Sequence, residues 1–213
     1  MKINFPLPTD KKRHRYCQNC LSEKVKDIKV KEKTLYQCED CGKSYDRLID
    51  IDPALTWWVD EKTKEYWHES IGVFIINSDG GILLIERVIF PYGFTIPAGH
   101  LEAGEKPLTA ATRELEEETG INADNLTLFS EEGVPNDRCR RGADYHKWHL
   151  YTYLLTNSQS IIPNRQEGKN PIWLTLEESL KQNFTYPTRF FLEKYGNKLI
   201  NSALPNLSGR TGN

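Results

Sequence analysis

Residues 99–121 constrain the fold of this chain more than any other stretch. Pro107 stands where a first helical residue is favoured, and Gly120 stands where a C-terminal cap is favoured. We therefore predict a helix over residues 107–119. Apolar side chains recur on it at helical spacing, which predicts one buried face. This stripe consists of Leu108, Ala111 and Leu115.

Three glutamates, Glu114, Glu117 and Glu118, are spaced i, i+3 and i+4 on the same helix and share one face. Partly desolvated carboxylates at this spacing would protonate unless a cation neutralised them. Oxygen ligands suit a hard divalent ion such as Mg²⁺ or Mn²⁺, so the pattern favours a metal site. A solvated acidic face is the alternative, and Glu116, which projects away from the other three, fits that description.

The spacing of the fixed residues resembles the Nudix box, G-x5-E-x7-R-E-U-x-E-E-x-G-U, in which U is a bulky aliphatic residue. Every fixed position is matched in this chain. The matching residues are Gly99, Glu105, Arg113, Glu114, Leu115, Glu117, Glu118, Gly120 and Ile121. The resemblance extends over about 69–195 and implies the family's α/β fold, a mixed sheet sandwiched between helices.

The flanking sequence has the composition that this fold requires. Expected strands cover 71–76 and 81–86, joined by a hairpin turn, and then 126–131, 145–155 and 172–174. Expected helices cover 176–182 and 188–194. On the strand at 145–155, His146 and His149 have odd spacing and fall on opposite faces, so we treat both as structural.

The resemblance implies metal-assisted hydrolysis of a phosphoanhydride. Glu114, Glu117, Glu118 and the Gly99 carbonyl are expected to hold Mg²⁺ or Mn²⁺ against a diphosphate. The expected substrate is a nucleoside diphosphate derivative, split into a nucleotide and a phosphorylated remainder. The resemblance further implies that Arg113 orients a carboxylate of the box and that Glu105 lies behind the metal ligands.

The proton acceptor for the attacking water is left open between Glu118 and Glu167. Glu167 lies on a loop that resembles the family's site for a further catalytic or metal-binding glutamate. An ordinary exposed carboxylate is the alternative interpretation of this residue. The rival carboxylates for the same role are Glu131, Glu132 and Asp144.

Several residues outside the box are candidates for substrate binding. Arg87 follows a predicted strand where the family often places a phosphate-binding arginine, and a compact basic loop precedes residue 145. Aromatic residues just before the box could stack on a base. The full candidate set is Arg87, Tyr92, Phe94, Arg138, Arg140 and Arg141. For the basic loop, an ordinary surface loop is an equal alternative, and Cys139 within it is a less favoured candidate nucleophile.

Four cysteines near the N-terminus are arranged as C-x2-C, seventeen residues, C-x2-C. Each pair can supply two thiolates to one tetrahedral Zn²⁺, and the segment resembles a zinc ribbon with a hairpin over 25–36. The ligands expected are Cys17, Cys20, Cys38 and Cys41. A disulfide pair is the competing interpretation, but no secretory signal is recognised and the rest of the chain is poor in cysteine.

These features divide the chain into a zinc ribbon with an N-terminal tail (1–50), an aromatic linker (51–68), a Nudix domain (69–195) and a flexible C-terminal tail (196–213). The tryptophans of the linker are expected to pack or to form an extra strand, with an aromatic clamp for a base as the alternative. Residues 1–48 contain twelve Lys/Arg and seven Asp/Glu, a formal charge of +5 within a chain of −2. Nucleic-acid binding by this basic module is conceivable but not favoured.

The layout resembles that of NADH pyrophosphatases, yet the chain lacks their Ser-Gln-Pro-Trp-Pro-Phe-Pro motif. We therefore favour an ADP-ribose-like or dinucleotide substrate, with two alternatives: an RNA 5′-end or cap pyrophosphohydrolase, and a non-catalytic nucleotide sensor. A cytoplasmic location and no membrane association are expected, because no apolar run is long enough to span a bilayer. The oligomeric state is left open, with a homodimer as one option.

Overall fold

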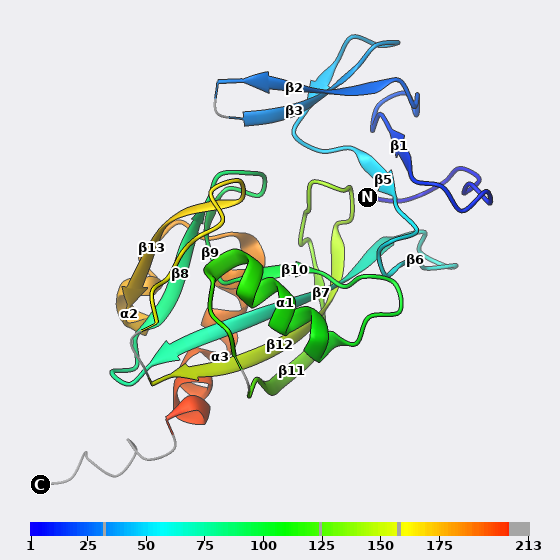
Figure 1. The fold of residues 1–213 in the computed structure, drawn as a ribbon. Helices are drawn as coiled ribbons and strands as arrows, with labels where there is room; N and C mark the ends of the chain where they lie inside the picture. The colour runs from blue at the N-terminus through cyan, green and yellow to red at the C-terminus, as the bar shows by residue number, and fades with distance from the viewer. Residues whose placement is uncertain (32, 124, 157–158, 205–213) are drawn as a thin grey trace, which may run out of the picture.

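The computed structural model describes residues 1–31, 33–123, 125–156 and 159–204. Figure 1 shows a small, strand-rich N-terminal module above a larger α/β body, with helix α1 on one side of the central sheet and helix α3 on the other. The predicted α/β architecture with a mixed sheet is confirmed. Among the described residues, no helix is long and apolar enough to cross a membrane.

The central sheet has the strand order β11-β12-β7-β8-β13, with β6 and β10 also paired to β7 and β9 paired to β8. It is mixed because β7 and β12 run parallel, whereas the other neighbours are antiparallel. The strands are β6 (Trp57–Val59), β7 (Tyr66–Asn77), β8 (Ile82–Arg87), β9 (Gly93–Thr95), β10 (Ala98–His100), β11 (Thr127–Pro135), β12 (Tyr145–Leu155) and β13 (Gly168–Leu174).

Strand β7 is buried on both faces, and its alternate residues divide between two cores. Ile71, Val73 and Ile75 pack in the cluster that receives helix α1 (Pro107–Thr119). Phe74 packs in the opposite cluster, with Phe191 of helix α3 (Tyr186–Ala203). A strand covered on both sides needs a continuous apolar sequence, which explains why 71–76 contains no charged residue.

The N-terminal module consists of short strands that pair with one another. Strands β2 (Val25–Val30), β3 (Lys33–Cys38) and β4 (Ser44–Tyr45) form one sheet, and β1 (His14–Tyr16) pairs with β5 (Ile49–Ile51). The hairpin predicted over 25–36 is therefore confirmed. A third core cluster, which includes Tyr16 and Ile51, joins this module to Tyr66 of β7.

Several boundaries differ from the sequence expectation. Helix α2 (Leu176–Ser179) is shorter than predicted, whereas α3 continues to Ala203, so the expected tail at 196–213 is helical over its first eight residues. Residues 205–213 of that tail lie outside the described residues. The helix continues because Leu199 is buried in the second core. This burial stabilises the C-terminal turns of α3, although most of the residues around Leu199 are polar.

The aromatic linker belongs partly to the sheet. Its tryptophans Trp57 and Trp58 lie on β6, and the segment from Tyr66 to His68 is the start of β7. Trp58 stacks on Trp67, and Trp57 meets Tyr66 edge-on, so the favoured packing role is confirmed.

The N-terminal tail and the face of α1 also differ in detail from the prediction. Ile3 is buried in the third core, which holds the start of the chain against the module. On α1, Leu108 is 49% exposed, and Ala110 takes the expected place of Leu108 against the sheet.

Candidate active site

The box helix is fixed at both ends by local sequence. Pro107 begins α1, and Gly120 ends it with φ of 72°, a conformation that glycine adopts without strain. The Gly120 N–H donates to the Glu116 carbonyl at 2.8 Å. Ala111 and Leu115 bury one face against the sheet, which leaves the glutamate face directed along the rim of a pocket.

Arg113 joins three carboxylates of the box, those of Glu105, Glu114 and Glu117, into one network. It donates to both carboxylate oxygens of Glu105 at 3.0 and 3.1 Å, to Glu114 at 2.8 Å and to Glu117 at 3.4 Å. Such a two-point contact from a planar guanidinium fixes direction as well as distance. Arg113 thus orients Glu114 and Glu117, and Glu105 holds Arg113 from behind.

Glu118 is the most buried carboxylate of the group. Its side chain accepts a hydrogen bond from the Ala98 N–H at 2.9 Å. Burial raises the pKa of Glu118 to about 8, and the charges of Glu114 and Glu167 add to the effect, against the opposing influence of Arg87. A carboxyl group in this environment holds its proton more readily than a free one, and a cation beside it would favour the ionised form.

Glu114 is packed directly against the backbone of β10. A Cβ atom placed on Gly99 would lie 2.0 Å from Glu114 Oε1, so glycine is required for this close approach. Burial raises the pKa of Glu114, with the charges of Glu117 and Glu167 in the same direction and Arg113 opposing them. The two glutamates therefore form a crowded acidic site.

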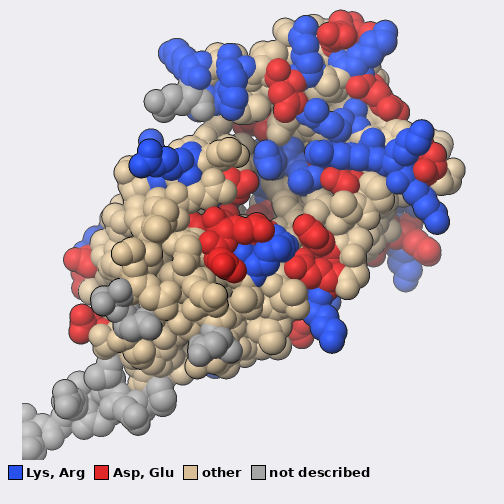
Figure 2. Space-filling model, viewed as in Figure 1, with Lys and Arg blue, Asp and Glu red and all other residues tan. Residues whose placement is uncertain are grey.

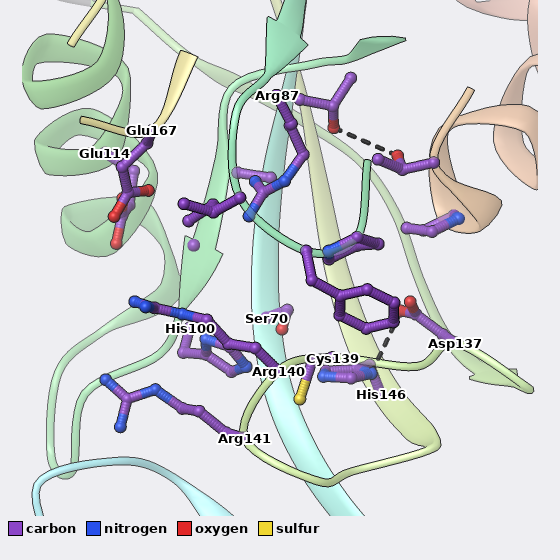
Figure 3. Close-up of a pocket in the computed structure, with 18 of the residues that line it drawn as sticks. Ser70, Arg87, His100, Glu114, Asp137, Cys139, Arg140, Arg141, His146 and Glu167 are labelled. Atoms are coloured by element: carbon purple, nitrogen blue, oxygen red, sulfur yellow. Dashed lines mark hydrogen bonds and ion pairs between the residues drawn. The ribbon is translucent and has the colours of Figure 1, made fainter. Parts of the chain in front are cut away.

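Glu114, Glu117 and Glu118 line a pocket of about 270 Å³ that also contains Gly99 and Glu167. Figure 3 shows Glu167 beside Glu114 at one end of this pocket. Glu167 comes from the turn immediately before β13, which pairs with β8. The pocket thus brings the box together with the further glutamate that the sequence singled out.

The rival carboxylates point elsewhere and do not line the pocket. Glu131 pairs with His149 at 2.6 Å, and Glu132 pairs with Lys194 of α3. Asp144 accepts from Arg47 at 2.6 Å. Each of the three is engaged in a contact that supports the fold.

All four candidate arginines line the pocket. Figure 3 shows Arg87 across the pocket from Glu114, and Arg140 and Arg141 toward the lower end of the view. Arg141 is held by Asp50 and Asp52 at 3.0 Å, whereas Arg138 is largely exposed. Arg87 enters from the end of β8. The space-filling view shows a group of acidic side chains on the α/β body, and many Lys and Arg interspersed with acidic residues on the module above it (Figure 2).

The aromatic candidates are placed differently from the expectation. Tyr92 lies under Lys33 of the N-terminal module, with the ammonium 4.6 Å from the ring centre, and Phe94 packs against the second core. Neither lines the pocket, whereas the neighbouring Phe90 does. The sequence analysis named Tyr92 and Phe94 and did not name Phe90, because the local pattern does not show which ring of this segment turns inward.

Four further residues of the pocket region were not recognised as a group from the sequence. His68, His100, Cys139 and His146 place one potential ligand atom each within 4.8 Å of one another. His146 and His149 do lie in separate environments, as their odd spacing predicts, but His146 belongs to this cluster. The four residues are far apart in the chain, so no local motif could have indicated them.

The four N-terminal cysteines also converge. Their sulfur atoms lie within 4.8 Å of one another, with 3.7 Å between Cys17 and Cys41 and 3.6 Å between Cys20 and Cys38. No disulfide joins them. Zinc–sulfur bonds of about 2.3 Å at tetrahedral angles require sulfur atoms about 3.8 Å apart, so the cluster has the geometry of a four-thiolate zinc site.

Comparison with known proteins agrees with this geometry. The NUDIX domain model matches residues 67–195. An RNA pyrophosphohydrolase of Cereibacter sphaeroides is 33% identical over 122 residues, which cover 51% of this chain and 75% of that protein. An ADP-ribose pyrophosphatase of Bacillus subtilis is 43% identical over 64 residues, 29% of this chain and 35% of that protein. A solved complex of a C. elegans Ap4A hydrolase has a TM-score of 0.50 and 25% identity, and covers 62% of this chain and 97% of that one.

Proposed function

This chain belongs to the Nudix family and is a Nudix hydrolase, and we propose that it cleaves the phosphoanhydride of nucleoside diphosphate derivatives with the help of Mg²⁺ or Mn²⁺. One observation supports this proposal above the others: five glutamates and four arginines line a single pocket. Carboxylates supply ligands for divalent cations, and arginines supply donors for phosphate oxygens.

The residues of the box fit a divalent cation. Glu114, Glu117 and Glu118, together with the Gly99 carbonyl, are the proposed ligands. Burial first, and the charges of Glu114 and Glu167 second, raise the pKa of Glu118, and a cation beside it would favour its ionised form. Bound at this position, the ion stabilises charge that develops on the phosphoryl oxygens and lowers the pKa of a coordinated water. Arg113 keeps Glu114 and Glu117 in place for it.

Glu167 is the proposed acceptor of the proton from the attacking water. It lines the pocket next to the box and, unlike Glu118, is only half-buried and lies on a turn before β13. A carboxylate that is partly open to solvent can accept a proton and release it again after each turnover. Glu118, with its carboxylate tied to the Ala98 N–H, is better suited to hold a cation.

The opposite wall suits a nucleotide substrate. Arg87 and Arg140 can bind phosphate oxygens, and Ile89, Phe90 and Pro91 offer an apolar surface for a base or ribose. An ADP-ribose-like compound or a dinucleotide has phosphates between two such groups. This preference agrees with the similarity to an ADP-ribose pyrophosphatase and to an Ap4A hydrolase.

A second candidate function is hydrolysis at the 5′ end of RNA. A polar groove lined by Arg13, Arg15, Arg140 and Arg141 connects the N-terminal module to the pocket region. Basic side chains along such a path could hold the phosphates that follow a 5′ terminus. The similarity to an RNA pyrophosphohydrolase is consistent with this alternative.

For the N-terminal module we propose a structural Zn²⁺ bound by the four cysteines. The sheet of β2, β3 and β4 presents few buried apolar side chains, which are too few to stabilise it alone. Four thiolates that close the coordination sphere are typical of a zinc ion that stabilises a fold rather than one that takes part in catalysis.

Incubation of the purified protein with Mg²⁺ and a substrate panel tests the function. The panel contains ADP-ribose, NADH, dinucleoside polyphosphates, nucleoside triphosphates and triphosphorylated RNA, and ³¹P NMR identifies the products. Glu117→Gln should lower kcat about a thousandfold, since a metal contributes several kcal/mol to the transition state. Glu116→Gln, on the other face of the same helix turn, is the matched control and should retain full activity.

The panel also separates the alternatives. Turnover of the small nucleotides in preference to RNA supports the favoured substrate class, and the reverse order supports the RNA alternative. Nucleotide binding without turnover of any panel member would contradict the hydrolase and favour the sensor. The intact set of box carboxylates argues against that outcome.

A further inference from the structure

Three imidazoles and one thiol meet in the interior beside the arginine-lined end of the pocket. The ligand atoms of His68, His100, Cys139 and His146 all lie within 4.8 Å of one another, and Sγ of Cys139 is 3.7 Å from Nδ1 of His68. Figure 3 shows the Cys139 sulfur between the rings of His100 and His146, away from the end that holds Glu114. This group is separate from the ligands of the box.

Sheet register explains the convergence. His68 of β7 stands directly beside His146 of the parallel strand β12. On the other side of β7, His100 of β10 is paired with Ser70, two residues beyond His68 and therefore on the same face. Three adjacent strands thus place their imidazoles on one face of the sheet, and the loop between β11 and β12 brings Cys139 over them.

One nitrogen of each imidazole in this cluster lacks a hydrogen-bond partner, and on His68 this is Nε2, since its Nδ1 faces the Cys139 thiol. Nε2 of His68, Nε2 of His100 and Nδ1 of His146 are all buried without one, within the part of the chain that the structure describes. His68 is fully buried and His146 is 2% exposed. Buried polar atoms are nearly always paired. Three unpaired imidazole nitrogens beside a thiol therefore indicate a binding partner, and a metal ion is one that accepts lone pairs from several such atoms at once.

The electrostatics favour a divalent cation as that partner. Three imidazoles at such close range cannot all carry a proton, and a neutral ring has a lone pair to offer a metal ion. Asp137 Oδ2 lies 3.1 Å from Nδ1 of His146, within ion-pair distance, and itself accepts a hydrogen bond from the Trp148 indole N–H at 2.7 Å. A divalent ion, one thiolate and the Asp137 carboxylate together carry no net charge, which suits a buried site.

The distances fit tetrahedral zinc. Zinc–nitrogen bonds of about 2.0–2.1 Å and a zinc–sulfur bond of about 2.3 Å place neighbouring ligand atoms about 3.4–3.6 Å apart. The observed 3.7 Å between Sγ of Cys139 and Nδ1 of His68 is close to this value, and all four ligand atoms lie within 4.8 Å of one another. A carboxylate behind a ligating histidine is a common outer partner of such sites. Four protein ligands fill a tetrahedral coordination sphere, which is typical of a structural metal site.

We propose that His68, His100, Cys139 and His146 form a second, structural Zn²⁺ site that anchors the arginine loop (residues 136–144) to the central sheet. The N-terminal module contacts the same loop from the other side, where Arg47 donates hydrogen bonds to the carbonyls of Cys139 and Ala143, both at 2.8 Å. The metal therefore fixes the position of Arg140 and Arg141 at the pocket. The importance of that position for substrate rests on the proposed function, whereas the presence of the metal does not.

Zinc content of the full chain tests the site directly. Protein produced with zinc, or reconstituted with Zn²⁺ after metal removal, should contain two tightly bound ions per chain, and Cys139→Ser and His100→Gln should each contain one. His149→Gln is the matched control, because His149 lies on the same strand as His146 but pairs with Glu131 and Glu69. It should retain two.

X-ray absorption at the zinc edge of the unmodified chain keeps the test valid even if these variants fail to fold. With both sites filled, the two zinc ions have five sulfur and three nitrogen ligands in total. With only the four-cysteine site filled, all ligands are sulfur. A mixed sulfur and nitrogen shell that becomes purely sulfur in Cys139→Ser supports the proposal. Saturation at one zinc per chain with only sulfur ligands would overturn it, whether or not the enzyme hydrolyses a nucleotide.

Discussion

Replacement of Gly99 by alanine should separate catalysis from stability in this protein. The added Cβ would lie 2.0 Å from one oxygen of the Glu114 carboxylate and 2.6 Å from the other. Ordinary contacts begin near 3.4 Å, so the carboxylate must retreat by about 1.4 Å. It can do so because it is the free end of a flexible side chain, and no backbone atom has to move with it.

The expected loss of activity follows from this displacement. A misplacement of about 1 Å in a catalytic group can cost a hundredfold in rate. For a metal ligand that retreats by more than that, we expect kcat to fall at least a hundredfold, equivalent to about 2.7 kcal/mol. The free energy of unfolding should fall by no more than about 1 kcal/mol, because the lost contact of Arg113 with Glu114 is partly offset by the lower chain entropy of alanine in the unfolded state.

Initial rates with Mg²⁺ and thermal unfolding of the same samples measure both quantities. A loss of about 1 kcal/mol lowers Tm by about 2–4 °C in a chain of this size. Gly133→Ala is the control, since its Cβ would meet only the edge of Trp67 at 3.2 Å, on an exposed strand away from the pocket. Full activity in Gly99→Ala, or a loss explained entirely by a large fall in Tm, would refute the argument.

Other predictions concern the supporting residues. The hydrogen bond from Arg113 lowers the pKa of Glu105. The ionised Glu105–Arg113 pair therefore stabilises the folded state above the ordinary carboxyl pKa, and this contribution is lost as the pH falls through the lowered pKa. Glu105→Gln should therefore lower Tm at pH 7 by a few degrees, and the difference from the parent should shrink in thermal scans toward pH 3. Arg140→Ala should raise KM about tenfold with little change in kcat, whereas Arg138→Ala, at a mostly exposed side chain, should change KM less than twofold in the same assay. A strong chelator should increase amide hydrogen exchange throughout β2 and β3 while α1 stays protected; equal protection with and without chelator would contradict a zinc-dependent module.

Much of the site was predictable from sequence because its parts are close together in the chain. Helical spacing places Glu114, Glu117 and Glu118 on one face, and Pro107 and Gly120 define the ends of the helix. Short spacing likewise pairs the cysteines of the N-terminal module. In each case a pattern of a few residues encodes contacts that form within the same helix or turn.

The positions of rings and helix ends depended on packing that the local pattern does not describe. Phe90 lines the pocket while Tyr92 and Phe94 turn away, although the three alternate within one short hairpin. Helix α3 continues past its predicted end because Leu199 finds space in the second core. Tertiary contacts of this kind outweigh the weak local preferences of the residues concerned.

The sequence by itself determined that the glutamates of the box share one helix face and that the four cysteines form two close pairs, since both depend on short spacing along the chain. Only the tertiary structure decided that His68, His100, Cys139 and His146 meet at one point. Their meeting depends on the register of three strands and on one loop closing over them, and register is set by burial across the whole sheet rather than by neighbours in sequence.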